Sequence, residues 1–369
     1  MADSVQNHRL IPFLSKYYDV HVLQRKQNDE NHSESIWSPN LSIIDRLLYK
    51  VFPSLFGIFS LDRYVWSKIA YYKIRTKLSD FSHVIMIYEP YTTRPLQFSI
   101  RRNFKNIKIT SVLYDPYVDN IFFGKSSIAV KLRKIIERKI VDASNLVVVN
   151  NSVILSKLKD RYPDVQLCLV PLCGLADSIS NQSDCSGTLT LVHAGNIYGE
   201  RRLDELNETI TILKSLKQIK PSDLKIVLIG SHCVGYEKVI ESGNDDIIKF
   251  QGPMYGDSFK SLMATSNALL LIDPMDGNNT CFPSKLCEYY QLSKPIFAFC
   301  AKGTPSYISL SEAGHVACSS DELMKMVLAL GDFVQNPDAF NNTFDISYAE
   351  HFHPSKVAEQ FNKVLRSLV

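Results

Sequence analysis

The run of residues most able to support chemistry is 276–290, DGNNTCFPSKLCEYY. Small polar residues form a loop there after an apolar run, and Pro283 suits the first position of a helix. Amide groups near Ser284 and Lys285 could then face an anion. Glu288 follows Lys285 by three residues and shares its helix face, where a carboxylate could accept the hydroxyls of a ribose. An ordinary surface ion pair between Lys285 and Glu288 is the alternative.

A second candidate lies at residues 193–202, HAGNIYGERR, after an apolar run at 189–193. A strand, a glycine-containing loop and an arginine at the mouth of a helix form a phosphate-binding arrangement. Gly195 lets backbone amides approach the anion, and Arg201 adds positive potential. The dinucleotide fingerprint GxGxxG is absent. A plain surface arginine pair starting a helix is the alternative.

Two shorter loops follow later apolar runs. They contain Gly230 with Ser231, and Gly252 with Pro253 and Met254. Ligands of α/β folds bind outside the carboxyl ends of the strands, so these loops could contact a nucleotide base. Simple turn residues are the alternative.

The elements that must position these loops alternate along the chain. Short apolar, β-branched runs are separated by longer amphipathic segments, which predicts parallel sheets covered by helices, the α/β class. We expect strands at 20–23, 83–88, 107–113, 146–149 and 166–170, and then at 189–193, 225–229, 247–250, 268–272, 295–299 and 315–318. Helical patterns cover 128–141, 202–216, 259–266 and 323–330, among others.

The two series of strands are separated by residues 171–188, a stretch rich in Gly, Ser, Asp and Asn without periodicity. A chain of 369 residues accommodates two domains. We therefore predict an amino-terminal domain at 1–175, a linker at 176–188, a second domain at 189–345 and a carboxy-terminal helix at 346–369.

Charge and aromatic residues divide unevenly over the chain. The formal net charge is only +3, but residues 1–175 hold 25 Lys and Arg against 15 Asp and Glu, a net of +10, which leaves −7 for the rest. Residues 49–123 hold 17 aromatic residues. These features predict either a core rich in rings with a solvated basic face, or a surface that lies against an anionic membrane leaflet. Positive charge is densest on one predicted helix of this half, which carries Lys131, Arg133, Lys134, Arg138 and Lys139.

The remaining composition limits the cellular setting and the partners. The amino terminus lacks the pattern of a signal peptide, and the most apolar run, 51–61, is interrupted by Pro53 and Gly57 and is too short to span a bilayer. None of the eight cysteines forms a CxxC pair, which favours free thiols in a reducing cytosol. We expect a cytoplasmic protein, peripheral on the inner face of the cell membrane, without a nucleic-acid partner.

Taken together, residues 189–335 resemble the nucleotide-sugar domain of retaining glycosyltransferases with the GT-B fold, of the family 4 or group 1 type found in bacterial surface-polysaccharide biosynthesis. The order of motifs matches: the GNIY…R loop, the LIG strand end, the FQGP turn and FPSKLCEYY. The first domain matches more loosely, through Tyr114-Asp115 and ASNLVVV at 143–149. The resemblance implies two Rossmann-like, doubly wound domains that face a cleft.

The resemblance also implies roles for individual residues. Arg201 falls where the family binds the donor diphosphate, assisted by Lys285, and Glu288 falls on the glutamate that holds the donor ribose. The family's first glutamate corresponds to Thr280, and its usual arginine after the first glycine is Asn196, so the donor's identity is in doubt. Asn278, Asn279 and Thr280 are then expected to contact the sugar. Asp115 matches a position near the acceptor, although a turn-forming Asp before Pro116 explains it as well.

The family's first domain opens with a strand and a glycine-rich loop, whereas this sequence starts with a helical segment at 3–18 and the strand at 20–23. That opening strand is central in a doubly wound sheet. We therefore expect the first domain to lack its first strand, so that two neighbouring strands lose their shared partner or close up. A strand formed by residues 1–7 would contradict this expectation.

The sequence thus predicts a hexosyltransferase-type glycosyltransferase that moves a sugar from a nucleotide-sugar donor to a lipid-linked or oligosaccharide acceptor, with retention of configuration. No Asp-x-Asp triplet occurs, so we expect no metal site, and no cofactor beyond the donor substrate. Lys285, Arg201 and helix amino termini would stabilise the departing diphosphate. A nucleotide-sugar epimerase on the same fold and a truncated, inactive nucleotide-binding homologue remain as alternatives.

Overall fold

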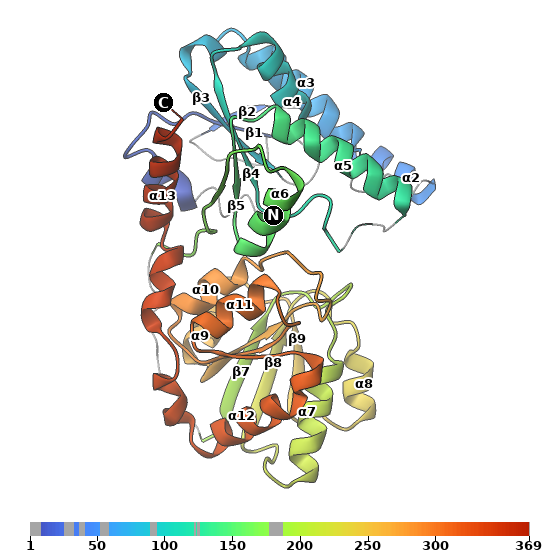
Figure 1. The fold of residues 1–369 in the computed structure, drawn as a ribbon. Coiled ribbons are helices and arrows are strands. Elements are labelled where there is room, and N and C mark those ends of the chain that lie inside the picture. Colours follow the sequence, from blue (N-terminus) through green and yellow to red (C-terminus); the bar gives the residue numbers. More distant parts are fainter. Residues whose placement is uncertain are drawn as a thin grey trace. The chain divides into compact units, whose positions relative to one another are not determined.

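The computed structural model describes residues 9–25, 33–36, 41–51, 59–88, 94–121, 123, 126–176 and 187–368. The chain forms two compact units (Figure 1). The first unit comprises Met1–Leu172, Thr280–Phe282 and Pro354–Val369, and the second comprises Cys173–Asn279 and Pro283–His353. Of the predicted linker, residues 177–186 lie outside the described residues.

The second unit is built on a six-stranded parallel sheet with the order β12-β11-β10-β7-β8-β9. Its strands are β7 (Leu189–Ala194), β8 (Leu224–Ile229), β9 (Ile248–Gly252), β10 (Ala268–Ile272), β11 (Ile296–Phe299) and β12 (Val316–Cys318). Every residue of β10 and β11 is buried, as expected for strands that are covered by helices on both faces. These are the strands that read in the sequence as continuous apolar runs.

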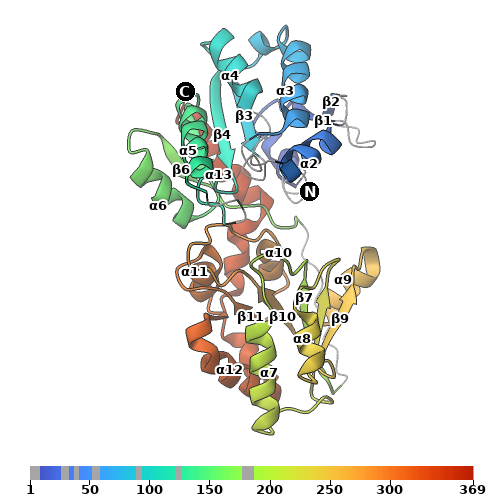
Figure 2. The same ribbon diagram turned by 90° about the vertical axis from the view of Figure 1, so that its right-hand side faces the viewer.

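Helices surround this sheet. They are α7 (Asp204–Ser215), α8 (Tyr236–Glu241), α9 (Gly256–Thr265), α10 (Lys285–Gln291), α11 (Pro305–Glu312) and α12 (Leu323–Gln335), with 3-10 turns η3 (Ser320–Glu322), η4 (Pro337–Asn342) and η5 (Ile346–Phe352). Helices α7 and α12 pack against each other (Figure 2), and Ile210 and Leu330 contribute from them to the core that contains Phe297.

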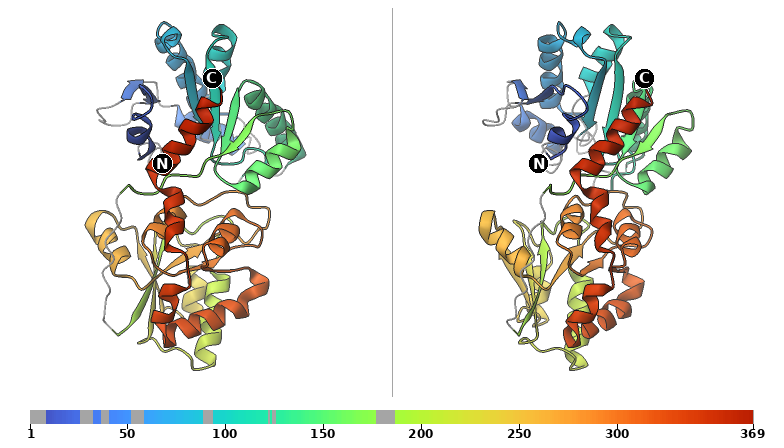
Figure 3. Two further views of the ribbon diagram at one scale, coloured as in Figure 1. Left: turned by 60° about the vertical axis from the view of Figure 1, so that its left-hand side comes forward. Right: turned by 90° about the vertical axis from the view of Figure 1, so that its left-hand side faces the viewer.

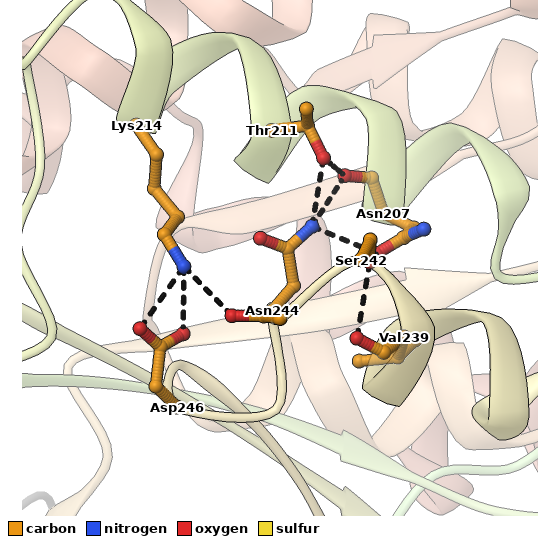
Figure 4. A network of polar contacts seen from close by, with 8 residues as sticks. Asn207, Thr211, Lys214, Val239, Ser242, Asn244 and Asp246 are labelled. Carbon is orange, nitrogen blue, oxygen red and sulfur yellow. Dashed lines mark hydrogen bonds and ion pairs between the residues drawn. The ribbon is translucent and has the colours of Figure 1, made fainter.

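A polar network fastens the turn before β9 to α7 (Figure 4). The amide nitrogen of Asn244, a residue only 1% exposed, lies 2.8 Å from Asn207 Oδ1 and 2.8 Å from Thr211 Oγ1. Lys214 Nζ lies 3.0 Å from both carboxylate oxygens of Asp246. These contacts hold the turn that directly precedes Ile248, where β9 begins.

The first unit contains a four-stranded parallel sheet, β3-β4-β5-β6, and a separate parallel pair, β1-β2. The strands are β1 (Val22–Arg25), β2 (Ser33–Ile36), β3 (His83–Tyr88), β4 (Lys108–Leu113), β5 (Leu146–Val149) and β6 (Leu167–Leu169). The helices are α2 (Ser42–Val51), α3 (Leu61–Ile74), α4 (Arg94–Asn103), α5 (Ser127–Asp142), α6 (Ser152–Arg161) and α13 (Pro354–Arg366), and η2 is Leu78–Asp80. Helix α13 lies along this unit (Figure 3), where Tyr18 donates a 2.9 Å hydrogen bond to Asn362 Oδ1.

Among the described strands, no strand pairs with both β1 and β3. Within the described residues, the pair β1-β2 and the sheet β3-β4-β5-β6 are thus separate, and the lack of a first strand stays a prediction. Residues 1–8, where a strand would contradict the prediction, lie outside the described residues, and the helical segment expected at 3–18 is described only from residue 9, with helix at 9–14.

A buried ionic cluster holds the loop that follows β4. Arg161 donates to Glu137 Oε1 at 2.5 Å and contacts both carboxylate oxygens of Asp119, at 2.9 and 2.7 Å. Glu137 in turn accepts the Val118 amide at 3.1 Å. Burial raises the pKa of Glu137, and the charge of Arg161 opposes that shift. The cluster fixes residues 118–119 and, with them, the loop that carries Asp115.

Candidate functional site

A pocket of about 340 Å³ opens in the second unit beside the carboxyl ends of β7 and β8. Its walls combine glycine-rich loops, the first turn of α10 and apolar side chains of α9. The lining residues are Ala194, Gly195, Asn196, Ile229, Gly230, Ser231, Pro253, Met254, Tyr255, Phe259, Met263, Lys285, Glu288, Tyr289 and Leu292. Parallel α/β sheets bind ligands at this edge.

Lys285 carries the cation of the pocket. Its ammonium lies 3.2 Å from Nε2 of His193, a fully buried residue of β7. Gly195 makes room for it, because a Cβ at Gly195 would come within 2.9 Å of Lys285 Nζ. Gly195 also adopts φ +133°, a conformation that glycine tolerates best. Gly195 and Lys285, which were both predicted to bind the donor, are therefore direct neighbours in the structure.

Arg201 and Asp273 form the second ionic element. Asp273 follows β10, is 2% exposed, and lies 3.5 Å from Arg201 Nη2. Its Oδ2 accepts a 2.6 Å hydrogen bond from Ser306 and lies 3.4 Å from Asn279 Nδ2. The Arg201 guanidinium also stacks over Tyr198, 5.6 Å from the ring centroid. Arg201 does not line the pocket itself, but its charge acts on Lys285.

The electrostatics of this corner favour an incoming anion. Burial and, secondarily, the positive charge of Arg201 lower the pKa of Lys285 to about 7, while Asp273 acts in the opposite direction. Burial and the neighbouring Lys285 lower the pKa of His193 well below its usual value. Burial raises the pKa of Asp273, and Arg201 opposes this rise. Arg201 lies beside Asp273, Lys285 lies beside Glu288 on the pocket wall, and an anion bound next to Lys285 would favour its ammonium form.

Glu288 lies on the pocket wall beside Lys285, as its spacing predicted. The prediction for Pro283 was wrong in detail. The helix α10 begins at Lys285 with Ser284 before it, and Pro283 stands outside. The reason is that the Pro283 carbonyl already accepts the Leu286 amide at 2.9 Å, which makes a tighter turn ahead of the helix. Ser284 does not line the pocket.

Asn196 lines the pocket, but its side-chain oxygen is engaged elsewhere. It accepts the amide of Ser231 at 2.7 Å and lies 3.3 Å from the amide of His232. The loop after β7 and the loop after β8 are thereby joined. Gly230 permits their close approach, because a Cβ there would meet the Gly195 carbonyl oxygen at 2.7 Å.

The base-contact candidates divide in two. Gly230, Ser231, Pro253 and Met254 line the pocket, whereas Gly252 does not. The sequence prediction missed several wall residues: Tyr255, Phe259, Met263, Tyr289 and Leu292. Four of these resemble ordinary core or helix residues in sequence. Tyr255 stands out in the structure because it is 77% exposed.

The predicted sugar contacts lie outside the pocket wall. Asp276 Oδ1 accepts two hydrogen bonds from Asn278, one from its backbone amide and one from its side-chain nitrogen, each 2.9 Å long. Asn279 is buried and its side chain faces Asp273. Thr280 is also buried, and it belongs to the first unit. The expected contact of these three residues with the sugar stays a prediction.

Asp115 lies in the first unit, half-buried in the loop after β4. The same unit carries the basic helix α5, and one prediction about it was wrong. Arg133 is only 1% exposed and packs over the Phe123 ring at 5.6 Å, so it does not belong to the basic surface. Lys131, Lys134, Arg138 and Lys139 are exposed.

Metal binding and membrane insertion can be assessed for the described residues. No group of three or more His, Cys, Asp and Glu side chains there could hold a metal ion. In the same residues, no helix combines the length and the apolar character needed to cross a bilayer.

The sequence matches no protein-family model and no curated protein. Solved structures match the fold. Sucrose-phosphate synthase from Thermosynechococcus elongatus has a TM-score of 0.71 at 14% identity, over 99% of this chain and 93% of that protein. WaaG, a glycosyltransferase involved in lipopolysaccharide biosynthesis, has a TM-score of 0.60 at 11% identity, over 98% and 95%.

TarM from S. aureus, in a complex that contains α-GlcNAc-glycerol and UDP, has a TM-score of 0.59 at 14% identity over 82% of this chain. The chain spans 59% of the length of that protein. Together these likenesses show that the chain has the GT-B fold, with two Rossmann-like domains on parallel sheets.

Proposed function

We propose that this protein is a glycosyltransferase that transfers a sugar from a nucleoside-diphosphate donor, bound in the second unit, to a lipid-linked or oligosaccharide acceptor. The observation that carries the proposal is the corner formed by Gly195, Lys285 and Arg201, next to a pocket with Glu288 on its wall. A bare backbone loop with two adjacent cations fits a diphosphate, and a neighbouring carboxylate fits a ribose.

In the proposed reaction, the bond between the anomeric carbon and the diphosphate oxygen breaks while the acceptor oxygen bonds to the same carbon. Lys285 and Arg201 stabilise the negative charge that develops on the leaving diphosphate. Both residues are part of the protein, so this stabilisation needs no metal ion. Retention of the anomeric configuration follows from the resemblance to the family 4 type and is part of the proposal.

A membrane-bound acceptor is supported by the outer face of α5. Ile128, Leu132 and Ile135 are 72%, 40% and 46% exposed and recur at helical spacing. The exposed Lys131, Lys134 and Lys139 flank them on the same helix. Apolar side chains framed by lysines suit an interface with anionic lipids. We therefore propose that the first unit binds the cytoplasmic membrane face, in a role related to surface-polysaccharide synthesis.

The first experiment is a thermal-shift screen of UDP-glucose, UDP-N-acetylglucosamine, GDP-mannose and ADP-glucose. A ligand that binds only the folded state raises the melting temperature. We expect at least one to do so and to be turned over. Glu288→Ala and Arg201→Ala should lower transfer at least tenfold. Glu237→Ala and Arg202→Ala, which change exposed residues outside the pocket lining, are the matched controls.

Product analysis separates the remaining possibilities. Transfer that persists in EDTA and retains the anomeric configuration supports the proposal in full. An epimerised donor formed without acceptor would replace transfer by epimerisation. Binding without turnover would indicate a nucleotide-binding protein, and near-normal rates in both site variants would remove the site assignment.

A further inference from the structure

His193 occupies an unusual place, since it is a fully buried polar residue near the end of an otherwise apolar strand. One ring nitrogen faces the neighbouring strand and the other faces the pocket. Nδ1 lies 3.0 Å from the Leu270 carbonyl oxygen and 3.3 Å from the Ile272 amide, both on β10. Nε2 lies 3.2 Å from Lys285 Nζ.

These contacts allow a neutral imidazole two complete arrangements. In one, Nδ1–H donates to the Leu270 carbonyl, and Nε2 accepts a hydrogen bond from the Lys285 ammonium. In the other, Nδ1 accepts the Ile272 amide, and Nε2–H donates to a neutral Lys285 amine. Each tautomer therefore matches one protonation state of Lys285, with a hydrogen-bond partner on β10 in either case.

The surroundings of Lys285 keep both states accessible. Burial disfavours the ammonium form of Lys285, and so does the charge of Arg201 in the loop after β7. The charge of Asp273, directly after β10, favours the ammonium form. Glu288 stands on the same helix one turn away and lines the same pocket. Burial keeps His193 itself neutral, because its pKa lies well below the usual value. Lys285, whose pKa burial lowers to about 7, therefore changes charge near neutral pH.

We propose that His193 is a positioning residue that holds Lys285 against the pocket in both protonation states, so that binding of a nucleoside-diphosphate sugar takes up one proton at Lys285. The inference rests on the proposed donor site. Lys285 gains the proton from solvent, while the imidazole exchanges its Nε2 proton for one on Nδ1 and stays neutral. The pocket therefore presents a cation when the diphosphate arrives.

The direction of the pH dependence follows from this step. At pH 6 the free site already carries the ammonium, so binding takes up little proton. At pH 8 most free sites hold the amine, and uptake approaches about 0.9 proton per ligand if Lys285 is fully protonated in the complex. The same linkage weakens binding about tenfold between pH 6 and pH 8.

Isothermal titration calorimetry of the full chain with the four nucleotide sugars tests this. Titrations at pH 6 and pH 8, each in two buffers with different ionisation enthalpies, give the number of protons taken up. The diphosphate of these sugars has no group that titrates in this range, so uptake belongs to the protein. Lys285→Arg places a cation that stays protonated at the same position and should bind with no uptake.

His193→Leu keeps the volume of a strand residue but removes both ring nitrogens. We expect it to bind at least tenfold more weakly at pH 6 and to lose the wild-type pH dependence, with an unchanged melting temperature in the absence of ligand. His193→Gln retains a donor and an acceptor near Nε2 and should restore part of the affinity. This rescue is a result that a purely structural role would not give.

The outcomes are distinct. If no nucleotide sugar binds, the proposed function falls and the inference with it. If one binds but no proton is taken up at pH 8, the donor site stands and the inference is wrong. Uptake that persists in Lys285→Arg assigns the proton to another group and overturns the inference. A wild-type pH dependence in both His193 variants removes the role of His193.

Discussion

Gly195 lies directly beside the Lys285 ammonium, and a Cβ on Gly195 would stand 2.9 Å from Nζ. The position of Lys285 therefore requires a glycine at residue 195. Since Lys285 and Glu288 both line the pocket, the glycine also influences the shape of the space that is open to a ligand.

Gly195→Ala is expected to weaken binding of the nucleotide sugar at least tenfold, because the methyl group would displace the ammonium. Calorimetry measures the affinity. Gly235→Ala is the matched control, since Gly235 also has positive φ (+89°) but no atom within 4 Å of its would-be Cβ. Both variants strain the backbone, and only Gly195→Ala should lose affinity. Equal affinities would contradict the steric argument.

Asp273→Asn keeps the shape of the side chain but removes the charge between Arg201 and Lys285. We expect the free energy of unfolding to fall by about 2–4 kcal/mol, because the half-buried Arg201 then loses the Asp273 carboxylate and Lys285 loses the charge that favours its ammonium. Chemical denaturation measures the change. Asp321→Asn breaks an exposed ion pair with Lys302, 2.8 Å long, and should leave stability close to wild type. A similar effect of both variants would argue against the buried cluster.

His315 stacks on Tyr290 and Phe344, with ring centroids 5.6 and 4.6 Å away, and burial lowers its pKa to about 4. The unfolded imidazole titrates near pH 6.5, so the folded state binds fewer protons between these values. Its contribution to stability is full above pH 6.5 and is lost as the pH falls through about 4.

Between pH 7 and pH 4, the free energy of unfolding should therefore fall by about 3 kcal/mol less in His315→Phe than in the wild type. Urea denaturation at both pH values measures the difference. The exposed His351→Phe serves as the control. A pH dependence of His315→Phe that equals the wild type would show that other groups account for the acid sensitivity.

The apolar stripe of α5 gives a prediction for the proposed membrane surface. Ile128→Ser combined with Leu132→Ser should reduce sedimentation with phosphatidylglycerol vesicles several-fold at low salt, because less apolar surface enters the interface. Pure phosphatidylcholine vesicles should bind weakly in all cases. Met324→Ser with Leu328→Ser changes similarly exposed residues on α12 in the acidic half of the chain, and should have no effect.

The strands were predictable where every residue is apolar. β3, β5 and β10 have the predicted bounds, because sheets covered on both faces leave uninterrupted hydrophobic runs. β2, with the sequence SESI, was missed, since three of its four residues are polar and it pairs only with β1. The expected helix start at Pro283 failed because a tight turn precedes α10, a matter of local hydrogen bonding that composition does not reveal.

The site was predictable from its loops but not from its strand ends. Gly195, Lys285 and Glu288 belong to motifs whose residue types and spacing indicate a ligand-binding role, and all three line the pocket. His193 and Asp273 were missed because each ends an apolar strand and reads as part of the core. The sequence does carry a signal for both, since His193 and Asp273 are polar residues that directly follow the apolar runs LTLV and ALLLI.

The Asn196 side chain couples two loops of the pocket. Its oxygen is the acceptor for the backbone amides of Ser231 and His232, so an arginine at position 196 would remove an acceptor from both. Because these amides belong to the backbone, no side-chain exchange at position 231 or 232 restores that acceptor by itself. A change at position 196 therefore alters two parts of the pocket wall at once, its own loop and the loop after β8.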